Sequence, residues 1–336
     1  MSEVEITICV PKKHTVMKPK ILILYRNMQG CLPELEARFN LVFPEEGEPI
    51  REEMLRLIPD CEGLFSAFNV SIDREIMMAA PKLKIIANYA VGYDNIDVAF
   101  ATERGIAVAN TPDPVVEPTA ELAFGLMIAA ARRIAECDRR LREDNIRWGL
   151  FENLGTVLIG KTLGIIGMGR IGQAVARRAS ASCMKVVYHN RTRLAADIEQ
   201  KYDAQYLSFD ELLATSDYVS LNMPLNAETH HLIDRAAFEK MKQGAILINT
   251  ARGAVVDEAA LTESLRKGKL RAAGLDVYEF EPKITPELLT MDNVVLAPHN
   301  GTAATEVREE MMRYTAGNIV RFFDKQHFAC VNPKVL

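Results

Sequence analysis

The sequence has little that would mark a secreted, membrane-spanning or nucleic-acid-binding protein. Its six cysteines are scattered, with no Cys-x-x-Cys and no paired spacing, a pattern typical of reduced thiols in a cytoplasm. The longest apolar run, from Leu122 to Ala131, is about half as long as a transmembrane helix. The N-terminus lacks the apolar core of a signal peptide. Acidic residues outnumber basic ones by 45 to 40, so we expect neither nucleic acid nor an anionic membrane as a partner.

What is present is the composition of an ordinary globular protein, with 336 residues of which 49% are hydrophobic and 25% charged. A chain of this length is expected to form two compact domains, and it needs no disulfide or metal to stabilise them. Residues 1–16 precede the first clear strand, and we interpret them as an N-terminal extension or a misplaced start; a short extra strand from Ile6 to Val10 is the alternative. We expect a cytoplasmic protein whose partner is a small molecule.

Short apolar strands alternate with helical segments along most of the chain, which is typical of parallel sheets covered by helices on both faces. In the first third, the expected strands are 21–24, 41–43, 64–66, 85–87 and 108–109. The expected helices between them are 33–39, 52–58, 74–80 and 96–104. Asp73 and Asn95 stand where helix N-caps are expected.

Three prolines between Asn110 and Pro118 predict a non-helical linker, and one long helix is expected after it, from Thr119 to Glu143. A second alternating series begins at Thr162. Its six expected strands are 163–166, 185–188, 218–221, 245–249, 273–276 and 294–296, and a last helix is expected over 305–323. Six strands with intervening helices predict a doubly wound, dinucleotide-binding fold.

The segment Gly167-Met-Gly-Arg-Ile-Gly172 has the spacing of a phosphate-binding loop, and it lies between an expected strand and an expected helix. In such a loop the first glycine permits the tight turn. Gly169 lets the backbone approach a pyrophosphate, and Gly172 lets the helix pack closely on the strand. The helix N-terminus adds N–H groups and a partial positive charge that attract phosphate. The alternative, a glycine-rich turn without a ligand, is disfavoured by spacing, strand and helix together.

The second strand of this fold normally ends at an acidic residue that binds the ribose 2′-hydroxyl of NAD. Asn190 occupies this position, and an amide would not repel the 2′-phosphate of NADP. Arg191 and Arg193 could each give that phosphate a charge-assisted hydrogen bond worth about 1.5–3 kcal/mol. We therefore expect NADP(H) to be preferred. If these arginines are simply solvated, NAD(H) binds as well.

Three chemically active residues, Arg252, Glu281 and His299, follow three of the later strands. Ligands bind at the carboxyl ends of parallel strands in such sheets. A guanidinium can bind the carboxylate of a 2-oxo acid and polarise its carbonyl. A histidine suits proton transfer because the ordinary pKa of imidazole lies near neutral pH, and a glutamate can hold its second ring nitrogen. Each residue also has an ordinary structural explanation, so it is their coincidence beside a glycine-rich loop that indicates a hydride-transfer enzyme.

Four segments of the chain strongly resemble the D-isomer-specific 2-hydroxyacid dehydrogenases: 167–172, 249–253, 274–282 and 298–301. The resemblance covers about residues 20–333. Within that family the chain is most similar to the glyoxylate/hydroxypyruvate and 2-ketogluconate reductases, in segments 190–193, 228–232 and 330–333.

The resemblance implies an α/β fold of two doubly wound parallel-sheet domains. A Rossmann nucleotide-binding domain, 115–301, is inserted into a flavodoxin-like substrate-binding domain made of 17–114 and 302–336. It also implies a homodimer built through the helix that matches Thr119–Glu143.

The same resemblance assigns catalysis to Arg252, Glu281 and His299, and it assigns the nicotinamide carboxamide to Asp276. The residues that we expect to contact the cofactor are Gly167, Gly169, Arg170, Ile171, Gly172, Asn190, Arg191, Thr192, Arg193, Pro224, Thr229, Thr250, Ala251, Asp276 and Gly301.

For the substrate, the resemblance implies that the backbone N–H groups of Val91 and Gly92 hold the carboxylate, together with Arg252. Phe68 and Asn69 are further candidates because they follow a strand of the first domain, although an ordinary loop explains them equally well.

These features predict a reductase of small 2-oxo acids such as glyoxylate, hydroxypyruvate and 2-ketogluconate, forming D-2-hydroxy acids. Two alternatives stay open: an NAD-linked D-2-hydroxyacid dehydrogenase with another substrate, and a non-catalytic protein that senses NAD(P)H. The adjacent His230 and His231 lack a third ligand, so no metal site is expected. Asn300 departs from the family pattern, in which an apolar residue is commoner after the catalytic histidine.

Overall fold

The computed structural model describes residues 18–45, 51–67 and 69–336. The expected N-terminal extension and Phe68 therefore lie outside the described residues. Contacts divide the chain into two units: unit 1 is Met1–Tyr89, Asn95–Asn110 and Thr315–Leu336, and unit 2 is Ala90–Asp94 and Thr111–Tyr314. Within the described ranges, no helix is both long and apolar enough to cross a bilayer.

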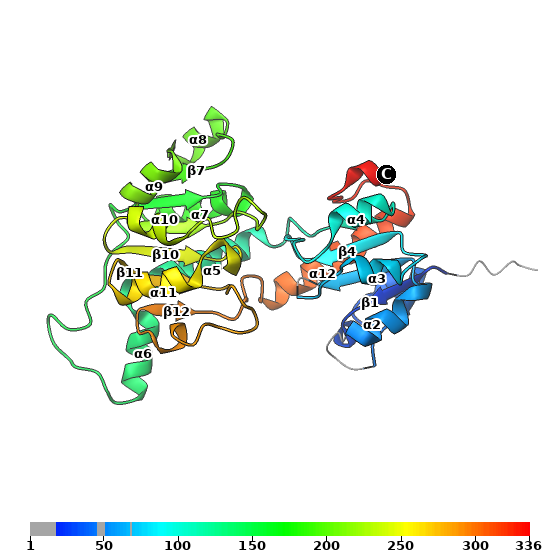
Figure 1. The fold of residues 1–336 in the computed structure, drawn as a ribbon, viewed down its shortest axis with the longest axis horizontal. Coiled ribbons are helices and arrows are strands. Elements are labelled where there is room, and N and C mark those ends of the chain that lie inside the picture. The colour runs from blue at the N-terminus through cyan, green and yellow to red at the C-terminus, as the bar shows by residue number, and fades with distance from the viewer. Residues whose placement is uncertain (1–17, 46–50, 68) are drawn as a thin grey trace, which may run out of the picture. The chain divides into compact units, whose positions relative to one another are not determined.

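Unit 1 is built on a parallel five-stranded sheet with the order β2-β1-β3-β4-β5 (Figure 1). Its strands are β1 (Lys20–Ile23), β2 (Asn40–Val42), β3 (Gly63–Ala67), β4 (Ile85–Tyr89) and β5 (Ala107–Ala109). Its helices are α1 (Pro33–Arg38), α2 (Arg51–Leu57), α3 (Arg74–Met78), α4 (Val98–Glu103) and the second half of α12 (Thr305–Phe323). Every residue of β3 and β4 is buried, as expected for central strands covered on both faces. The strand order is the predicted flavodoxin-like one.

One of the two predicted helix caps in unit 1 is confirmed. Asp73 caps α3 with its side chain. Asn95 does not cap a helix: its amide donates to the carbonyls of Ala67 and Val70, at 3.1 and 2.8 Å. The N-cap of α4 is Asp97, two residues later. Asn and Asp are equally good caps, so the local pattern could not choose between these positions.

Unit 2 is built on a parallel seven-stranded sheet with the order β12-β11-β10-β9-β6-β7-β8 (Figure 1). Its strands are β6 (Thr162–Ile166), β7 (Lys185–His189), β8 (Ala204–Tyr206), β9 (Tyr218–Leu221), β10 (Ala245–Asn249), β11 (Leu270–Leu275) and β12 (Val294–Leu296). Its helices are α5 (Val116–Arg132), α6 (Ile134–Arg142), α7 (Arg170–Ala181), α8 (Ala196–Tyr202), α9 (Phe209–Thr215), α10 (Arg235–Lys240), α11 (Glu258–Arg266) and the first half of α12. The order reverses at β6, so this is the predicted doubly wound fold. The prediction of six strands misses β8, a three-residue edge strand.

Helices cover both faces of the unit 2 sheet. In β10, Ala245 and Leu247 belong to one apolar core, while Ile246 and Ile248 belong to another. The first core includes side chains of α9, α10 and α11, and the second includes side chains of α5 and α7. Successive side chains of a strand point to opposite faces, so a strand buried on both sides must be apolar throughout.

The predicted linker from Asn110 to Pro118 is wrong at its C-terminal end. The first three residues of α5 are Val116, Glu117 and Pro118. Proline is tolerated there because the first turn of a helix has no internal partner for its N–H groups.

The predicted single helix from Thr119 to Glu143 is also wrong. It is divided into α5 and α6 at Arg133, which has a left-handed backbone with a φ of 56°. The carbonyl of Ala131 accepts the N–H of Thr156 at 2.8 Å. In a continuous helix that carbonyl would accept an N–H four residues later, so this long-range bond ends the helix.

Candidate active site

The glycine-rich loop follows β6 and leads into α7, beside the end of β9. Gly167 has a φ of 90°, and a Cβ there would lie 2.7 Å from the Met223 nitrogen. A Cβ on Gly172 would lie 2.5 Å from the Gly167 carbonyl oxygen, so helix and loop are too close for a side chain. A Cβ on Gly169 would meet no described atom within 4 Å, so that side of the loop is open. The loop has the close packing and the open side that a phosphate-binding turn requires.

Two further contacts fix the loop and the start of α7. Asn190, at the end of β7, accepts the Met168 N–H with its side-chain oxygen at 2.6 Å. Arg170 and Ile171 are the first residues of α7, and the Arg170 guanidinium pairs with Asp113 at 2.6 Å. The Asn190 amide therefore lies on the glycine-rich loop as well as at the position expected for the ribose contact.

The two arginines after Asn190 have different surroundings. Arg193 forms a two-pronged ion pair with Glu199, with distances of 2.8 and 2.9 Å, and the Tyr188 hydroxyl donates to the same carboxylate at 2.6 Å. The hydrogen bonds from Arg193 and Tyr188 lower the pKa of Glu199 to about 2. Arg191 pairs with Glu228 at 2.9 Å, and its side chain is 83% exposed. The Arg191 guanidinium is therefore more available for binding a ligand than the Arg193 guanidinium.

Five further residues expected at the cofactor, Thr192, Pro224, Thr229, Thr250 and Ala251, lie after β7, β9 and β10. Thr192 lies in the bend that follows β7. The Thr229 hydroxyl donates to the Pro224 carbonyl at 2.7 Å and closes the turn after β9. Thr250 and Ala251 follow β10. The buried hydroxyl oxygen of Thr250 has no hydrogen-bond partner in the part of the chain that the structure describes.

Glu281 and His299 meet, although they lie on loops after different strands. His299 Nδ1 lies 2.8 Å from Glu281 Oε2, and Glu281 Oε1 accepts the Tyr278 N–H at 2.8 Å. Burial acts to raise the pKa of Glu281. The hydrogen bond and charge of His299, the Tyr278 N–H and the charge of Arg252 outweigh it and hold that pKa below its ordinary value. The carboxylate is thus ionised and oriented beside the imidazole, with the Arg252 guanidinium near enough to act on it.

Asp276 holds the loop that carries His299. Its backbone carbonyl accepts the His299 N–H at 2.8 Å, and its carboxylate accepts the N–H groups of Asn300 and Gly301 at 2.7 and 2.9 Å. Burial raises the pKa of Asp276 above its ordinary value, against the effect of these hydrogen bonds. His299 has a φ of 52°, a conformation that a non-glycine residue adopts only where its surroundings impose it. The sequence predicts a cofactor contact for Asp276 and gives no sign of this structural role.

Arg252 is oriented by a carboxylate that the sequence analysis does not single out. Its Nε donates to both oxygens of Asp94, at 2.9 and 3.1 Å, and one terminal nitrogen donates to the Ala251 carbonyl at 2.8 Å. The other terminal nitrogen would lie 1.8 Å from a Cβ on Gly92. A side chain at this position would therefore displace the guanidinium where it crosses the backbone. Asp94 could have been singled out from the sequence, because it is a carboxylate shortly after the carboxyl end of β4.

The expected substrate-binding residues fall into different units. Val91 and Gly92 belong to the short segment Ala90–Asp94, which is part of unit 2. Arg252 also belongs to unit 2. Asn69 belongs to unit 1, where its side-chain oxygen accepts the Tyr25 hydroxyl at 2.5 Å.

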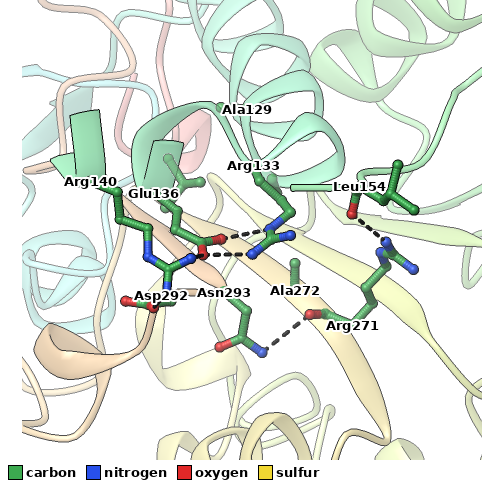
Figure 2. A pocket seen from close by; sticks show the side chains of 11 residues that line it. Ala129, Arg133, Glu136, Arg140, Leu154, Arg271, Ala272, Asp292 and Asn293 are labelled. Atoms are coloured by element: carbon green, nitrogen blue, oxygen red, sulfur yellow. Dashed lines mark hydrogen bonds and ion pairs between the residues drawn. The ribbon is translucent and has the colours of Figure 1, made fainter. Parts of the chain in front are cut away.

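A cavity of about 400 Å³ lies elsewhere in unit 2, lined by residues of α5, α6, β11 and β12 (Figure 2). Figure 2 shows Glu136 between Arg133 and Arg140. Its carboxylate lies 2.6 Å from the Arg133 guanidinium and 3.2 Å from that of Arg140. Arg271 donates to the Leu154 carbonyl at 3.1 Å. None of the predicted site residues that the structure describes lines this cavity, so it is separate from the candidate active site.

A glycine-rich loop at the switch point of a doubly wound sheet, with a His–Glu pair and an arginine at later strand ends, defines a nicotinamide-dependent dehydrogenase. Residues 124–301 match the family model described as D-isomer specific 2-hydroxyacid dehydrogenase, NAD binding domain. The chain belongs to the D-isomer-specific 2-hydroxyacid dehydrogenase family. It is an NAD(P)-dependent oxidoreductase that acts on 2-hydroxy acids.

Individual relatives agree with the family model. The chain is 45% identical over 311 residues to a glyoxylate reductase of Korarchaeum cryptofilum, covering 91% of this chain and 93% of that protein. It is similar to the crystal structure of a glyoxylate reductase from Paecilomyes thermophila, with a TM-score of 0.86, 38% identity, and coverage of 94% and 99%. It is also similar to an NADPH-dependent glyoxylate/hydroxypyruvate reductase from Sinorhizobium meliloti solved with NADP and malonate, with a TM-score of 0.85, 31% identity, and coverage of 95% and 98%.

Proposed function

We propose that the protein reduces glyoxylate, and that hydroxypyruvate and 2-ketogluconate are further substrates, each converted to a 2-hydroxy acid of the D series where a chiral centre forms. Relatives named glyoxylate reductase span more than nine-tenths of the chain. The observation that carries the proposal is the 2.8 Å hydrogen bond between Glu281 and His299. Reduction of a carbonyl needs a proton donor at its oxygen, and an imidazole held by a carboxylate can provide one.

In the proposed reaction the nicotinamide cofactor, when bound, supplies a hydride to the carbonyl carbon. His299 acts as the general acid and gives a proton from Nε2 to the carbonyl oxygen, since its Nδ1 is engaged by Glu281. Glu281 keeps the ring in place and stabilises its charged form. Arg252 binds the substrate carboxylate and polarises the carbonyl. The backbone N–H groups of Val91 and Gly92 complete the carboxylate site.

The residues at the switch point of unit 2 fit a dinucleotide. The open side of Gly169 and the N-terminus of α7 would take the pyrophosphate. Two buried polar atoms, Thr250 Oγ1 and Asn222 Oδ1, have no partner among the described residues, and both follow strands that end at this edge. Buried polar atoms are nearly always hydrogen-bonded, so two such atoms without a partner support the binding of a polar ligand here. Asp276 would hold the nicotinamide carboxamide.

We propose that NADP(H) is preferred over NAD(H). Asn190 gives no carboxylate that would repel a 2′-phosphate, and the exposed Arg191 can turn toward one. Arg193 contributes less than the sequence suggests, because Glu199 already holds its guanidinium. The preference therefore depends mainly on one arginine.

We also propose domain roles, an assembly and a compartment. Residues 17–114 and 302–336 form the substrate-binding domain, and 115–301 the dinucleotide-binding domain. After α6, the residues Trp148, Leu150 and Phe151 are 86%, 85% and 81% exposed. Large exposed apolar side chains in one segment indicate a surface that another protein covers, here a second copy in a homodimer.

The five described cysteines form no disulfide, which supports a location in the cytoplasm.

The test is a substrate panel with the purified chain. Oxidation of NADPH and NADH is followed by the loss of reduced-nicotinamide absorbance with glyoxylate, hydroxypyruvate and 2-ketogluconate. We expect turnover with glyoxylate, faster at low cofactor concentration with NADPH. No oxidation with any of these acids, while the cofactor still binds, would refute the proposed activity and favour either a nucleotide-sensing protein or a dehydrogenase of another 2-hydroxy acid. Sedimentation of the same sample tests the homodimer.

A further inference from the structure

The loop after β11 carries a second glutamate, whose partners differ from those of Glu281. Glu279 lies two residues earlier, and its side chain is 13% exposed. Its Oε1 lies 2.7 Å from His231 Nε2, and its Oε2 accepts the Glu258 N–H at 3.2 Å. The proposed reaction uses none of these groups, although the loop they hold is the one that presents Glu281 to His299.

Glu258 returns the contact. It is 3% exposed, its Oε1 accepts the Glu279 N–H at 2.7 Å, and its Oε2 accepts the Thr285 hydroxyl. Each of the two glutamates thus binds the backbone of the other, and we call Glu258 and Glu279 the glutamate clamp. Buried carboxylates are tolerated only when they are well hydrogen-bonded. As the first residue of α11, Glu258 also lies at the positive end of a helix.

The loop that carries Arg252 is tied to the same clamp. A Cβ on Gly253 would lie 1.8 Å from the Tyr278 carbonyl carbon, so the two loops touch backbone to backbone. The His231 N–H donates to the Ala254 carbonyl at 2.8 Å, while its ring contacts the clamp. The loops that carry the proposed catalytic arginine and glutamate therefore share one set of contacts.

We propose that Glu279 is a positioning residue, which fixes the Arg252 loop and the Glu281 loop relative to each other through His231 and Glu258. The inference rests on the proposed function, because it assigns Glu279 an effect on that reaction. Glu279 reaches no reacting atom. It acts by holding Glu281 where it can orient His299, and a displacement of about 1 Å in such a constellation can cost roughly a hundredfold in rate.

The competing explanation is that the clamp merely stabilises the start of α11. The two explanations differ in what they predict for folded protein. A purely stabilising role lowers the melting temperature and leaves kcat of the folded protein unchanged. If Glu279 is a positioning residue, its replacement lowers kcat and leaves cofactor affinity unchanged. Hydrogen exchange of the 278–281 amides also increases, because in the unsubstituted protein Glu258 protects the Glu279 N–H.

The experiment compares Glu279→Ala, Glu279→Gln and His231→Ala in the full chain with the control Glu287→Gln, an exposed glutamate in the loop that follows. We measure kcat and KM for glyoxylate, the dissociation constant of NADPH, and hydrogen exchange at a temperature where all variants are folded. Wild-type activity is measured first, because its absence would refute the proposed function and not this inference.

We expect Glu279→Ala to lose about ten- to a hundredfold in kcat, with NADPH affinity within about twofold of wild type. Glu279→Gln should recover most of that loss, since an amide oxygen can still accept the Glu258 N–H. If Glu279→Ala does not fold, His231→Ala carries the test with a smaller loss of the same kind. A kcat within twofold of wild type in folded Glu279→Ala and in His231→Ala, or a parallel loss of NADPH affinity, would overturn the inference.

Discussion

Replacement of Arg191 by alanine should weaken the binding of NADPH far more than the binding of NADH. In the structure its guanidinium pairs with Glu228 at 2.9 Å, and both side chains are exposed. A charge-assisted hydrogen bond to the 2′-phosphate is worth about 1.5–3 kcal/mol. Giving up an exposed ion pair costs about 0–1 kcal/mol. The net contribution is about 0.5–3 kcal/mol, so NADPH should bind roughly two- to 150-fold more weakly to the variant.

Arg193 and Glu228 provide matched comparisons. Arg193→Ala removes a guanidinium that both oxygens of Glu199 already hold, so it should change the ratio of the two affinities by only a few-fold. Glu228→Gln removes the carboxylate that competes with phosphate for Arg191, so it should tighten NADPH binding by a few-fold and leave NADH unchanged. Removing the charge of Arg191 and removing the charge of Glu228 should thus change the ratio of the NADPH and NADH affinities in opposite directions.

The assay is calorimetric titration of each variant with NADPH and with NADH at one fixed ionic strength, because phosphate contacts weaken as salt increases. The ratio of the two dissociation constants is the quantity compared. An equal loss of both cofactors in Arg191→Ala, or a larger change of the ratio in Arg193→Ala, would refute the assignment of the 2′-phosphate to Arg191.

Three other substitutions test the candidate site. His299→Ala should lower kcat by about 10²–10⁴ with NADPH affinity retained, and near-normal turnover would remove His299 from the mechanism. Gly92→Ala should displace the Arg252 guanidinium and raise KM for glyoxylate at least tenfold, since even a bare methyl group overlaps a terminal nitrogen; an unchanged KM would contradict the contact. Glu281 has a folded-state pKa below its unfolded value, so its contribution to stability is complete at neutral pH and is lost as the pH falls through the folded pKa. Melting temperatures in acid should therefore fall more steeply for wild type than for Glu281→Gln, and parallel curves would argue against the lowered pKa.

The fold was predictable because its determinants are local. The strands are short apolar runs, and each lies where the burial of both sheet faces requires it. The glycine spacing at Gly167 and Gly172 reports two close backbone approaches that the structure contains. The meeting of Glu281 and His299 followed from topology, because parallel strands place their carboxyl ends at one edge.

What the sequence did not show depends on contacts between distant residues. The break at Arg133 follows from a bond between Ala131 and Thr156, and no helix propensity encodes that bond. The pairing of Arg252 with Asp94 joins positions 158 residues apart. The reciprocal contacts of the glutamate clamp are equally invisible to a local pattern, since each carboxylate reads as an ordinary surface residue until its partner is known.

The central claim is that His299 and Glu281 act as one unit on one proton. It is tested most directly by kcat for glyoxylate in His299→Gln, Glu281→Gln and the double variant, each at saturating cofactor and substrate. When two residues act as a unit, replacing both lowers kcat little more than replacing one. We therefore predict that the double variant is about as slow as His299→Gln alone. Losses that multiply in the double variant, or a fully active His299→Gln, would contradict the account.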